Sequence, residues 1–154
     1  MLRTFLIVLV LAPSLIADDA TKAKKLSFEV HSGYFVSNKA KLDGASSYRV
    51  IKDKKSFDQI FGVGFVMNDR SNRLKPNAFD AHIVLSTIKK GKSIWKYKVT
   101  TLIARGKTLT VKYQATAGNP GTASFVSPMI VSVPRGEWKK IVFVENGKTV
   151  KTVK

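Results

Sequence analysis

The segment 93–117, SIWKYKVTTLIARGKTLTVKYQATA, determines the fold class of this sequence. Apolar and polar side chains alternate along both of its halves, as they do in a strand that buries one face in a protein core. In the first half the apolar face carries Trp95, Tyr97, Val99 and Ile103, and the polar face carries Lys96, Lys98 and Thr100. In the second half the corresponding sets are Leu109, Val111 and Tyr113, and Thr110, Lys112 and Gln114. The intervening Arg105-Gly106-Lys107 predicts a turn, so the two halves form an antiparallel hairpin.

Strand patterns also dominate the rest of the chain. Runs of β-branched and aromatic residues predict strands over residues 27–36, 47–51, 78–88, 124–133, 140–145 and 149–153. Asn146-Gly147 joins the last two as a two-residue hairpin turn. Residues 89–92 predict another turn, and Pro128 predicts an edge strand or a bulge. Because short turns favour antiparallel pairing, we expect a mostly β (α+β) fold: a largely antiparallel sheet or small sandwich of about eight strands with one short helix.

The one predicted helix covers residues 52–61. Its apolar residues recur at helical spacing, as Phe57, Ile60 and Phe61. Ser56 and Gln59 have the spacing of a capping box, a pattern typical of a helix N-terminus. A polar loop is expected to follow over residues 67–78.

The first 17 residues have the order of a secretory signal peptide. Arg3 is followed by the apolar run FLIVLVLA (5–12), by Pro13 and by a small residue, Ala17, at the expected cleavage position. The run is shorter than the about 20 residues that a membrane-spanning helix requires. We therefore expect a secreted or periplasmic protein, cleaved near Ala17, with no membrane span in the mature chain. Residues 18–26 are expected to be a flexible lead-in to a single β-rich domain over residues 27–154.

Composition excludes several classes of protein. The chain has 154 residues and no cysteine, so it is neither a disulfide scaffold nor a thiol enzyme. Its 44% hydrophobic residues, 10% aromatic overall, are enough for a folded core. Lys and Arg total 27 against 10 Asp and Glu, a net charge of +17, which attracts anionic partners by long-range steering.

The order of features from residue 48 onward resembles a known bacterial family. A strand ending in Val50-Ile51 is followed by SFDQIF (56–61), by Phe79-Asp80 before IVL (83–85), by two long alternating strands, and by SPMIVSVP (127–134) before IVF (141–143). This order is similar to the secreted domain named after the PrcB subunit of a protease complex. The Phe-Asp pair stands in the reverse order here, and GKSIW (91–95) replaces a Gly-Tyr segment of that family. The resemblance implies a non-enzymatic exported domain that acts as an accessory or inhibitor of an extracellular protease.

Residues able to support catalysis or metal binding are few. Asp80 and His82 would share one face of a strand, which gives two members of a hydrolytic triad without the Gly-x-Ser-x-Gly motif that supplies a nucleophile. A metal site needs three or four ligands at suitable spacing, and no clear third ligand accompanies this pair. We therefore predict no catalytic residue, no metal and no cofactor, and keep a hydrolase of unrecognised type as an alternative.

Lysines of the central hairpin are the candidate binding residues. Lys96, Lys98 and Lys112 project from its polar face and Lys107 lies at its turn, so together they would form one cationic stripe. Such a stripe suits an anionic polysaccharide or envelope surface, whereas a solvated lysine face that only keeps the protein soluble is the alternative interpretation. Lysine supplies point charges rather than bidentate recognition, which argues against sequence-specific nucleic-acid binding.

The sequence thus predicts an exported, non-catalytic interaction domain that binds a protein or an anionic envelope component. The two alternatives are a protease accessory or inhibitor acting through a protruding loop at residues 118–123, and a hydrolase using Asp80 and His82.

Overall fold

The computed structural model of the chain describes residues 22–64 and 72–154. The expected signal peptide and residues 67–71 of the expected polar loop lie outside the described residues. The strands are β1 (Lys24–Leu26), β2 (Glu29–His31), β3 (Tyr34–Val36), β4 (Ser46–Ile51), β5 (Phe61–Val63), β6 (His82–Gly91), β7 (Trp95–Arg105), β8 (Thr108–Ala117), β9 (Phe125–Pro134), β10 (Lys140–Glu145) and β11 (Lys148–Val153). The helices are α1 (Lys54–Ile60) and the single turn α2 (Ala78–Ala81). The predicted mostly β fold is confirmed.

The strands form two large sheets and one small one. Sheet A has the order β1-β7-β8-β10-β11, sheet B has the order β2-β9-β6-β4, and β3 pairs with β5. Neighbouring strands are antiparallel except β8 and β10, which run parallel. The predicted central hairpin is β7–β8. At the β10–β11 turn Asn146 and Gly147 have φ values of 49° and 83°, as the predicted two-residue turn requires.

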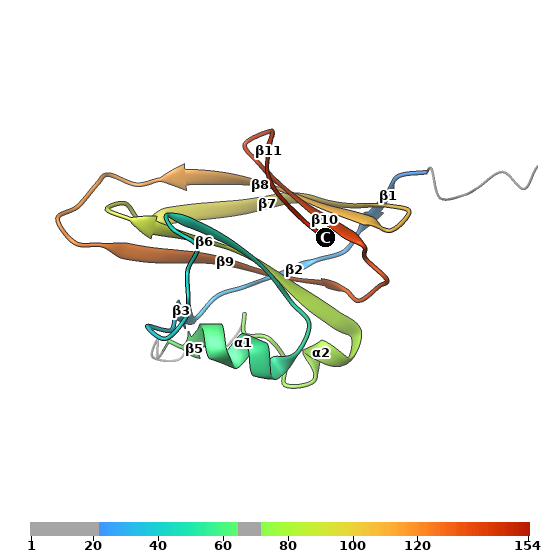
Figure 1. Cartoon of the computed structure of the whole chain (residues 1–154), viewed down its shortest axis with the longest axis horizontal. Helices are drawn as coiled ribbons and strands as arrows, with labels where there is room; N and C mark the ends of the chain where they lie inside the picture. Colours follow the sequence, from blue (N-terminus) through green and yellow to red (C-terminus); the bar gives the residue numbers. More distant parts are fainter. Residues whose placement is uncertain (1–21, 65–71) are drawn as a thin grey trace, which may run out of the picture.

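Sheets A and B pack face to face as a sandwich, with sheet A uppermost in Figure 1. The main core lies between them and takes Leu85 and Val131 from sheet B and Leu109, Val111 and Phe143 from sheet A, all without exposed surface. These residues come from the alternating apolar positions of their strands, so each strand contributes every second side chain.

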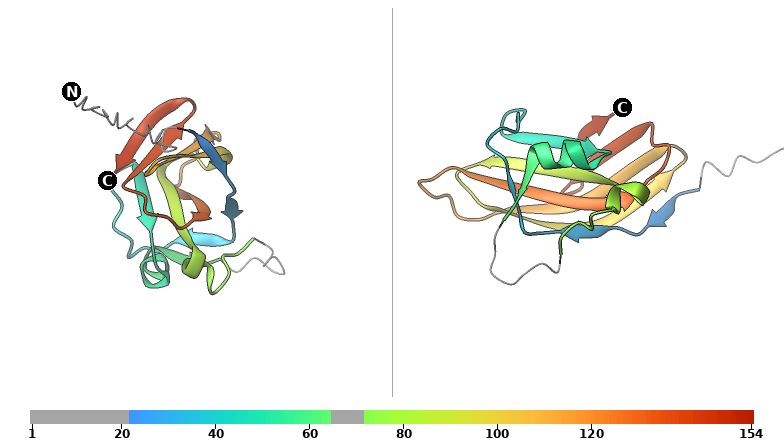
Figure 2. Two further views of the ribbon diagram at one scale, coloured as in Figure 1. Left: turned by 90° about the vertical axis from the view of Figure 1, so that its right-hand side faces the viewer. Right: turned by 90° about the horizontal axis from the view of Figure 1, so that it is seen from below.

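The other face of sheet B is buried as well, under a third layer. Val84, Ile88 and Ile130 of this face form a second core with Phe57 of α1 and Phe61 of β5. Figure 2 shows α1 and α2 lying on this face when the molecule is seen from below. Burial on both faces explains why residues 83–89 of β6 are buried without interruption, unlike the alternating strands of sheet A.

Three local predictions were wrong. Lys24–Leu26, expected in a flexible lead-in, form β1 and pair with β7. Residues 78–81, expected to begin a strand, form α2, which Asn77 precedes as the N-cap residue. Residues 89–92 are not a turn, since β6 continues to Gly91 and pairs there with Phe125 of β9.

A β-bulge corrects the predicted faces of β7. Val99 lies opposite Tyr113, but the next paired residue is Thr101, opposite Lys112, so Thr100 is the extra residue of the bulge. The register then places Leu102 in the core and turns Ile103, predicted to be on the apolar face, to the outer side. Alternation alone does not reveal such an insertion.

The start of α1 also differs from the predicted capping box. Asp53 is the N-cap residue, and its carboxylate accepts hydrogen bonds from the backbone nitrogen and the hydroxyl of Ser56 at 2.8 and 2.9 Å. These bonds hold the pKa of Asp53 below its ordinary value. Ser56 therefore lies inside the first turn instead of capping it.

Pro128 lies in neither the edge strand nor the bulge that was predicted, because β9 stands between β2 and β6 in sheet B and its pairing with β6 is regular at this position. It lies opposite Ile88 of β6, while β2 pairs with β9 only over residues 130–132. At Pro128, β9 thus has one neighbouring strand in the described part of the chain, so the missing N–H removes no hydrogen bond to a second strand.

Neither helix of the described residues has the length and apolarity needed to cross a membrane.

Candidate functional site

Basic side chains gather on the outer face of sheet A, which we call the basic face. Its exposed cations come from four strands, as the pairing register shows: Lys25 (β1), Lys96, Lys98 and Arg105 (β7), Lys112 (β8) and Lys140 (β10). The five strands of sheet A contain one acidic residue, Glu145, whose side chain points to the interior. The ion pairs among the described residues include none of these cations. The basic face is therefore an uncompensated positive surface.

Three of the four predicted lysines share this face. Lys96 and Lys98 lie opposite Thr116 and Gln114, and Lys112 lies opposite Thr101. Lys107 is at the β7–β8 turn, and its ammonium pairs with the Glu137 carboxylate at 3.1 Å. The predicted stripe thus exists as a sheet face, with Lys107 at its end and partly neutralised.

The basic face contains a hollow of about 450 Å³ beside Lys112. Its lining consists of Thr100, Lys112, Tyr113, Gln114, Val144, Asn146 and Gly147. The bulge of β7 forms one side, β8 the floor and the β10–β11 turn the other side. Polar and apolar groups line it together, which is the composition of a site for a small polar ligand.

A largely buried polar network lies behind the basic face, at one end of the space between the sheets. The Lys89 ammonium donates to the Glu145 carboxylate at 2.5 Å, and these two side chains are only 11% and 12% exposed. The Tyr113 hydroxyl donates to the other Glu145 oxygen at 3.1 Å and accepts from Thr87 at 3.0 Å. Lys89 also lies 3.8 Å from the centre of the Trp95 ring. The polar atoms of this network bond to one another, so the network links the two sheets and leaves no polar group of its own free to bind a ligand.

Three tyrosines, Tyr48, Tyr97 and Tyr113, lie in or beside this network, and each has a raised pKa. Burial raises the pKa of Tyr97 and Tyr113 far above the ordinary range of a phenol, and the Glu145 carboxylate raises it further. Burial likewise raises the pKa of Tyr48, which packs on Phe143 with 5.4 Å between ring centres. The raised pKa values favour neutral phenols, and the Tyr97 and Tyr113 hydroxyls donate hydrogen bonds to Ser127 O and to Glu145.

Asp80 and His82 line a hollow with Glu29, His31 and Ser132 between β2, β9 and α2. Asp80 is on α2, not on a strand, so the expected shared face does not exist. The Ser132 hydroxyl donates to His31 Nε2 at 2.8 Å, because His31 Nδ1 donates to the Asn72 carbonyl at 3.2 Å. Burial lowers the pKa of His31, which favours this neutral form.

This arrangement does not present a nucleophile in the way a hydrolase requires. Ser132 is only 3% exposed, and its partner is His31 rather than His82. The hydrogen bonds of the described residues do not connect Asp80 with either histidine. The hydrolase alternative stays a prediction without added support from the geometry. Groups of three or more histidine, cysteine or acidic side chains able to hold a metal ion do not occur among the described residues.

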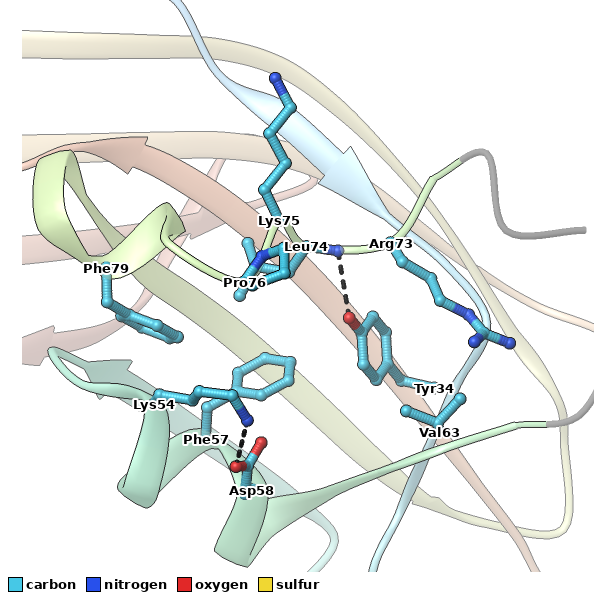
Figure 3. A pocket seen from close by; sticks show the side chains of 10 residues that line it. All are labelled: Tyr34, Lys54, Phe57, Asp58, Val63, Arg73, Leu74, Lys75, Pro76 and Phe79. Atoms are coloured by element: carbon cyan, nitrogen blue, oxygen red, sulfur yellow. Dashed lines mark hydrogen bonds and ion pairs between the residues drawn. The ribbon is translucent and has the colours of Figure 1, made fainter.

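A smaller apolar hollow of about 220 Å³ lies beside α1 (Figure 3). Its apolar lining consists of Tyr34, Phe57, Val63, Leu74, Pro76 and Phe79. Tyr34 Oη accepts a hydrogen bond from the Leu74 backbone at 3.0 Å, and Lys54 pairs with Asp58 at the rim. The ammonium of Lys75 points away from the hollow in Figure 3. The hollow is thus an extension of the second core, and its chemistry does not select a ligand.

The β8–β9 loop, residues 118–124, is exposed along its whole length and lies at the left-hand end of Figure 1. Two backbone hydrogen bonds brace it: Gly118 N donates to Ile94 O at 2.9 Å, and Gly121 N to Lys92 O at 2.7 Å. The expectation of a protruding loop here agrees with this geometry.

Sequence reasoning missed part of the basic face. Lys25, Arg105 and Lys140 join it because β1 and β10 flank the central hairpin, and no local pattern specifies which strands become neighbours in a sheet. It also missed the Lys89–Glu145 pair, since Lys89 was expected in a turn.

No family model matches this chain, and the searches of curated proteins and of solved structures gave no match either. The resemblance to the PrcB-type domain therefore stays a prediction.

Proposed function

We propose that this chain is an exported, non-catalytic domain that binds an anionic polysaccharide of the cell envelope through the basic face. The observation that carries the proposal is the set of exposed cations on one face of sheet A, which no other described element covers and to which the strands of sheet A contribute no acidic side chain. Such a surface raises the local concentration of anions and accelerates their association. A broad array of separate charges suits a polymer that carries many anionic groups.

The residue types on this face favour a polysaccharide over a nucleic acid. Five of the six cations are lysines, which supply point charges without the bidentate geometry used to read bases or phosphates. The aromatic rings of the hairpin, Trp95, Tyr97 and Tyr113, pack towards the core and offer no stacking platform for bases. Threonine and glutamine side chains lie between the lysines, and these groups hydrogen-bond to hydroxyls.

Retention on heparin, compared with a sulfonate cation exchanger of equal charge density, tests the proposal. The wild-type chain should elute from heparin at the higher salt concentration. The triple variant Lys96→Ser/Lys98→Ser/Lys112→Ser should lose this difference. At about 1 kcal/mol per lysine near an anionic surface, its affinity for heparin should fall by about a hundredfold.

The matched control removes three charges from the opposite side of the molecule. Lys39, Lys41 and Lys55 are exposed near α1, and the variant with all three replaced by serine has the same net charge as the first triple variant. Its heparin retention should stay close to that of the wild-type chain. Equal losses in both triple variants would show that only net charge matters and would refute the proposed site.

Export is supported by the n-region, apolar run and small residue of the first 17 positions. Expression of the full chain in a bacterial host, followed by intact-mass measurement of the periplasmic fraction, tests it. Cleavage near Ala17 should leave a chain that begins at Asp18. Full-length chain found only in the cytoplasm would contradict export.

A protease accessory or inhibitor is the second candidate, and the exposed, doubly braced β8–β9 loop favours it. A loop held before binding loses less entropy on entering a cleft. Replacement of residues 118–123 by a Gly-Ser linker of equal length should abolish binding to a secreted protease if this loop carries it. An unchanged inhibition or binding constant would rule out the loop.

A further inference from the structure

We infer that the hollow on the basic face is a monosaccharide subsite, which selects an acidic sugar residue over other anions of equal charge. The inference rests on the polysaccharide-binding function proposed above and assigns a specificity-determining site to it. The hollow lies between the bulge of β7 and the β10–β11 turn, with β8 as its floor. Figure 1 shows this turn at the top of the molecule, above β8.

Hydrogen bonds to β8 fix both sides of the hollow. On one side Thr100 Oγ1 donates to the Lys112 carbonyl at 3.1 Å, which holds the bulge residue against the floor. On the other side Asn146 N donates to Tyr113 O at 3.0 Å. The Asn146 side-chain amide also bonds both to the backbone nitrogen and to the carbonyl of Ala115, each at 3.0 Å. The hollow is therefore formed before any ligand arrives, which lowers the entropic cost of binding.

The groups left free in the hollow match the groups of an acidic sugar. The described residues make no hydrogen bond or ion pair with the Lys112 ammonium or the Gln114 amide, and Lys98 lies directly opposite Gln114 on the same face. An ammonium binds a carboxylate or sulfate, and a carboxamide both donates to and accepts from ring hydroxyls. Val144 supplies an apolar contact for the C–H surface of the ring.

A polyphosphate chain lacks the hydroxyls and the ring, so it can use only the ammonium groups. The hollow thus gives the basic face a preference that charge density alone does not produce. The surrounding lysines, Lys96 and Lys98 among them, attract both kinds of polymer, and the hollow distinguishes them.

Calorimetric titration with two probes of equal charge number tests the inference. The probes are a heparin-derived tetrasaccharide, which carries uronic acid and sulfate groups, and a linear polyphosphate. At the same ionic strength the tetrasaccharide should bind at least about tenfold more tightly, the effect of about one good hydrogen bond. The variant Gln114→Ala should lose about that factor for the tetrasaccharide and none for polyphosphate.

The control variant is Thr116→Ala, which alters the same face of β8 outside the hollow. It should bind both probes like the wild-type chain. Equal affinities for the two probes, or the same tetrasaccharide affinity in Gln114→Ala as in the wild-type chain, would overturn the subsite. If these results occur while the Lys96/Lys98/Lys112 variant still loses affinity for both probes, the basic face stands and only the subsite fails. If that triple variant binds both probes like the wild-type chain, the proposed function itself fails.

Discussion

The two sheets share one core but differ on their other faces. The second face of sheet B contributes to the stability of the fold, whereas that of sheet A is available for binding. The outer face of sheet B is apolar and lies under α1 and the β3–β5 pair. The outer face of sheet A is cationic and has no covering layer among the described residues. Because burial stabilises the first face while the charges of the second contribute little to folding, sheet A is free to carry a binding surface.

Removal of a ring from the covered side should have the largest effect. Phe57 is buried and packs on Tyr34, Phe61 and Phe79 with 5.0–5.9 Å between ring centres. Phe57→Ala should lower the free energy of unfolding by about 3–5 kcal/mol, since it leaves a cavity in the second core. Urea unfolding measures this loss. Val142→Ala on the partly exposed basic face is the comparison and should cost less than about 1 kcal/mol.

The Lys89–Glu145 pair should come next. Glu145→Leu leaves the largely buried Lys89 ammonium without its acceptor, and we expect a loss of about 2–4 kcal/mol in the free energy of unfolding. The double variant Lys89→Met/Glu145→Leu should be more stable than Glu145→Leu alone, because it removes the orphaned charge. A double-mutant cycle from denaturant unfolding reports the coupling. Additive losses would show that the pair does not act as a unit.

Acidification should weaken the attachment of β2. Burial lowers the pKa of His31 below its ordinary value of 6.5, so the folded state favours the neutral ring while the unfolded chain takes up the proton first. This contribution to stability is fully present above pH 6.5 and is lost as the pH falls below it. The other titratable or charged side chains that line the same hollow are Glu29, Lys75, Asp80 and His82. Of these four, only His82 is replaced in the variants described next, and it is replaced in the control variant alone.

Unfolding midpoints at pH 7 and pH 5 measure the effect. His31→Gln should reduce the loss of stability between the two values, whereas the control His82→Gln should keep the loss seen in the wild-type chain. An identical pH dependence in His31→Gln and wild type would show that His31 is not the titrating group.

The smallest effect is expected for single lysines of the basic face. Lys98→Ala removes an exposed side chain that has no ion-pair partner among the described residues, so the free energy of unfolding should change by no more than about 0.5 kcal/mol. Its heparin affinity should nevertheless fall. A large loss of stability would mean that the face has a structural role.

Much of sheet A could be predicted from the sequence, because the alternation of apolar and polar residues along each strand indicates locally which side chains face the core. Trp95, Tyr97 and Tyr113 were expected to face the core, and Lys96, Lys98 and Lys112 to face outward, and the structure places them so. The faces beyond Thr100 were not predictable, since a bulge changes the register without a local signature. The hollow was not predictable either, because it joins the bulge to the distant Asn146 turn through a parallel pairing of β8 and β10.

The proposed role of the basic face can be tested residue by residue by titrating the ¹⁵N-labelled protein with a heparin tetrasaccharide and following the backbone amide signals. The shifts should be largest for residues of β7, β8 and β10 on the outer face of sheet A, with Lys98, Lys112 and Gln114 at their centre. Signals of α1 and of the second core should stay in place. Shifts centred on α1, or spread evenly over lysines on every side of the molecule, would contradict the assignment of the binding surface to sheet A.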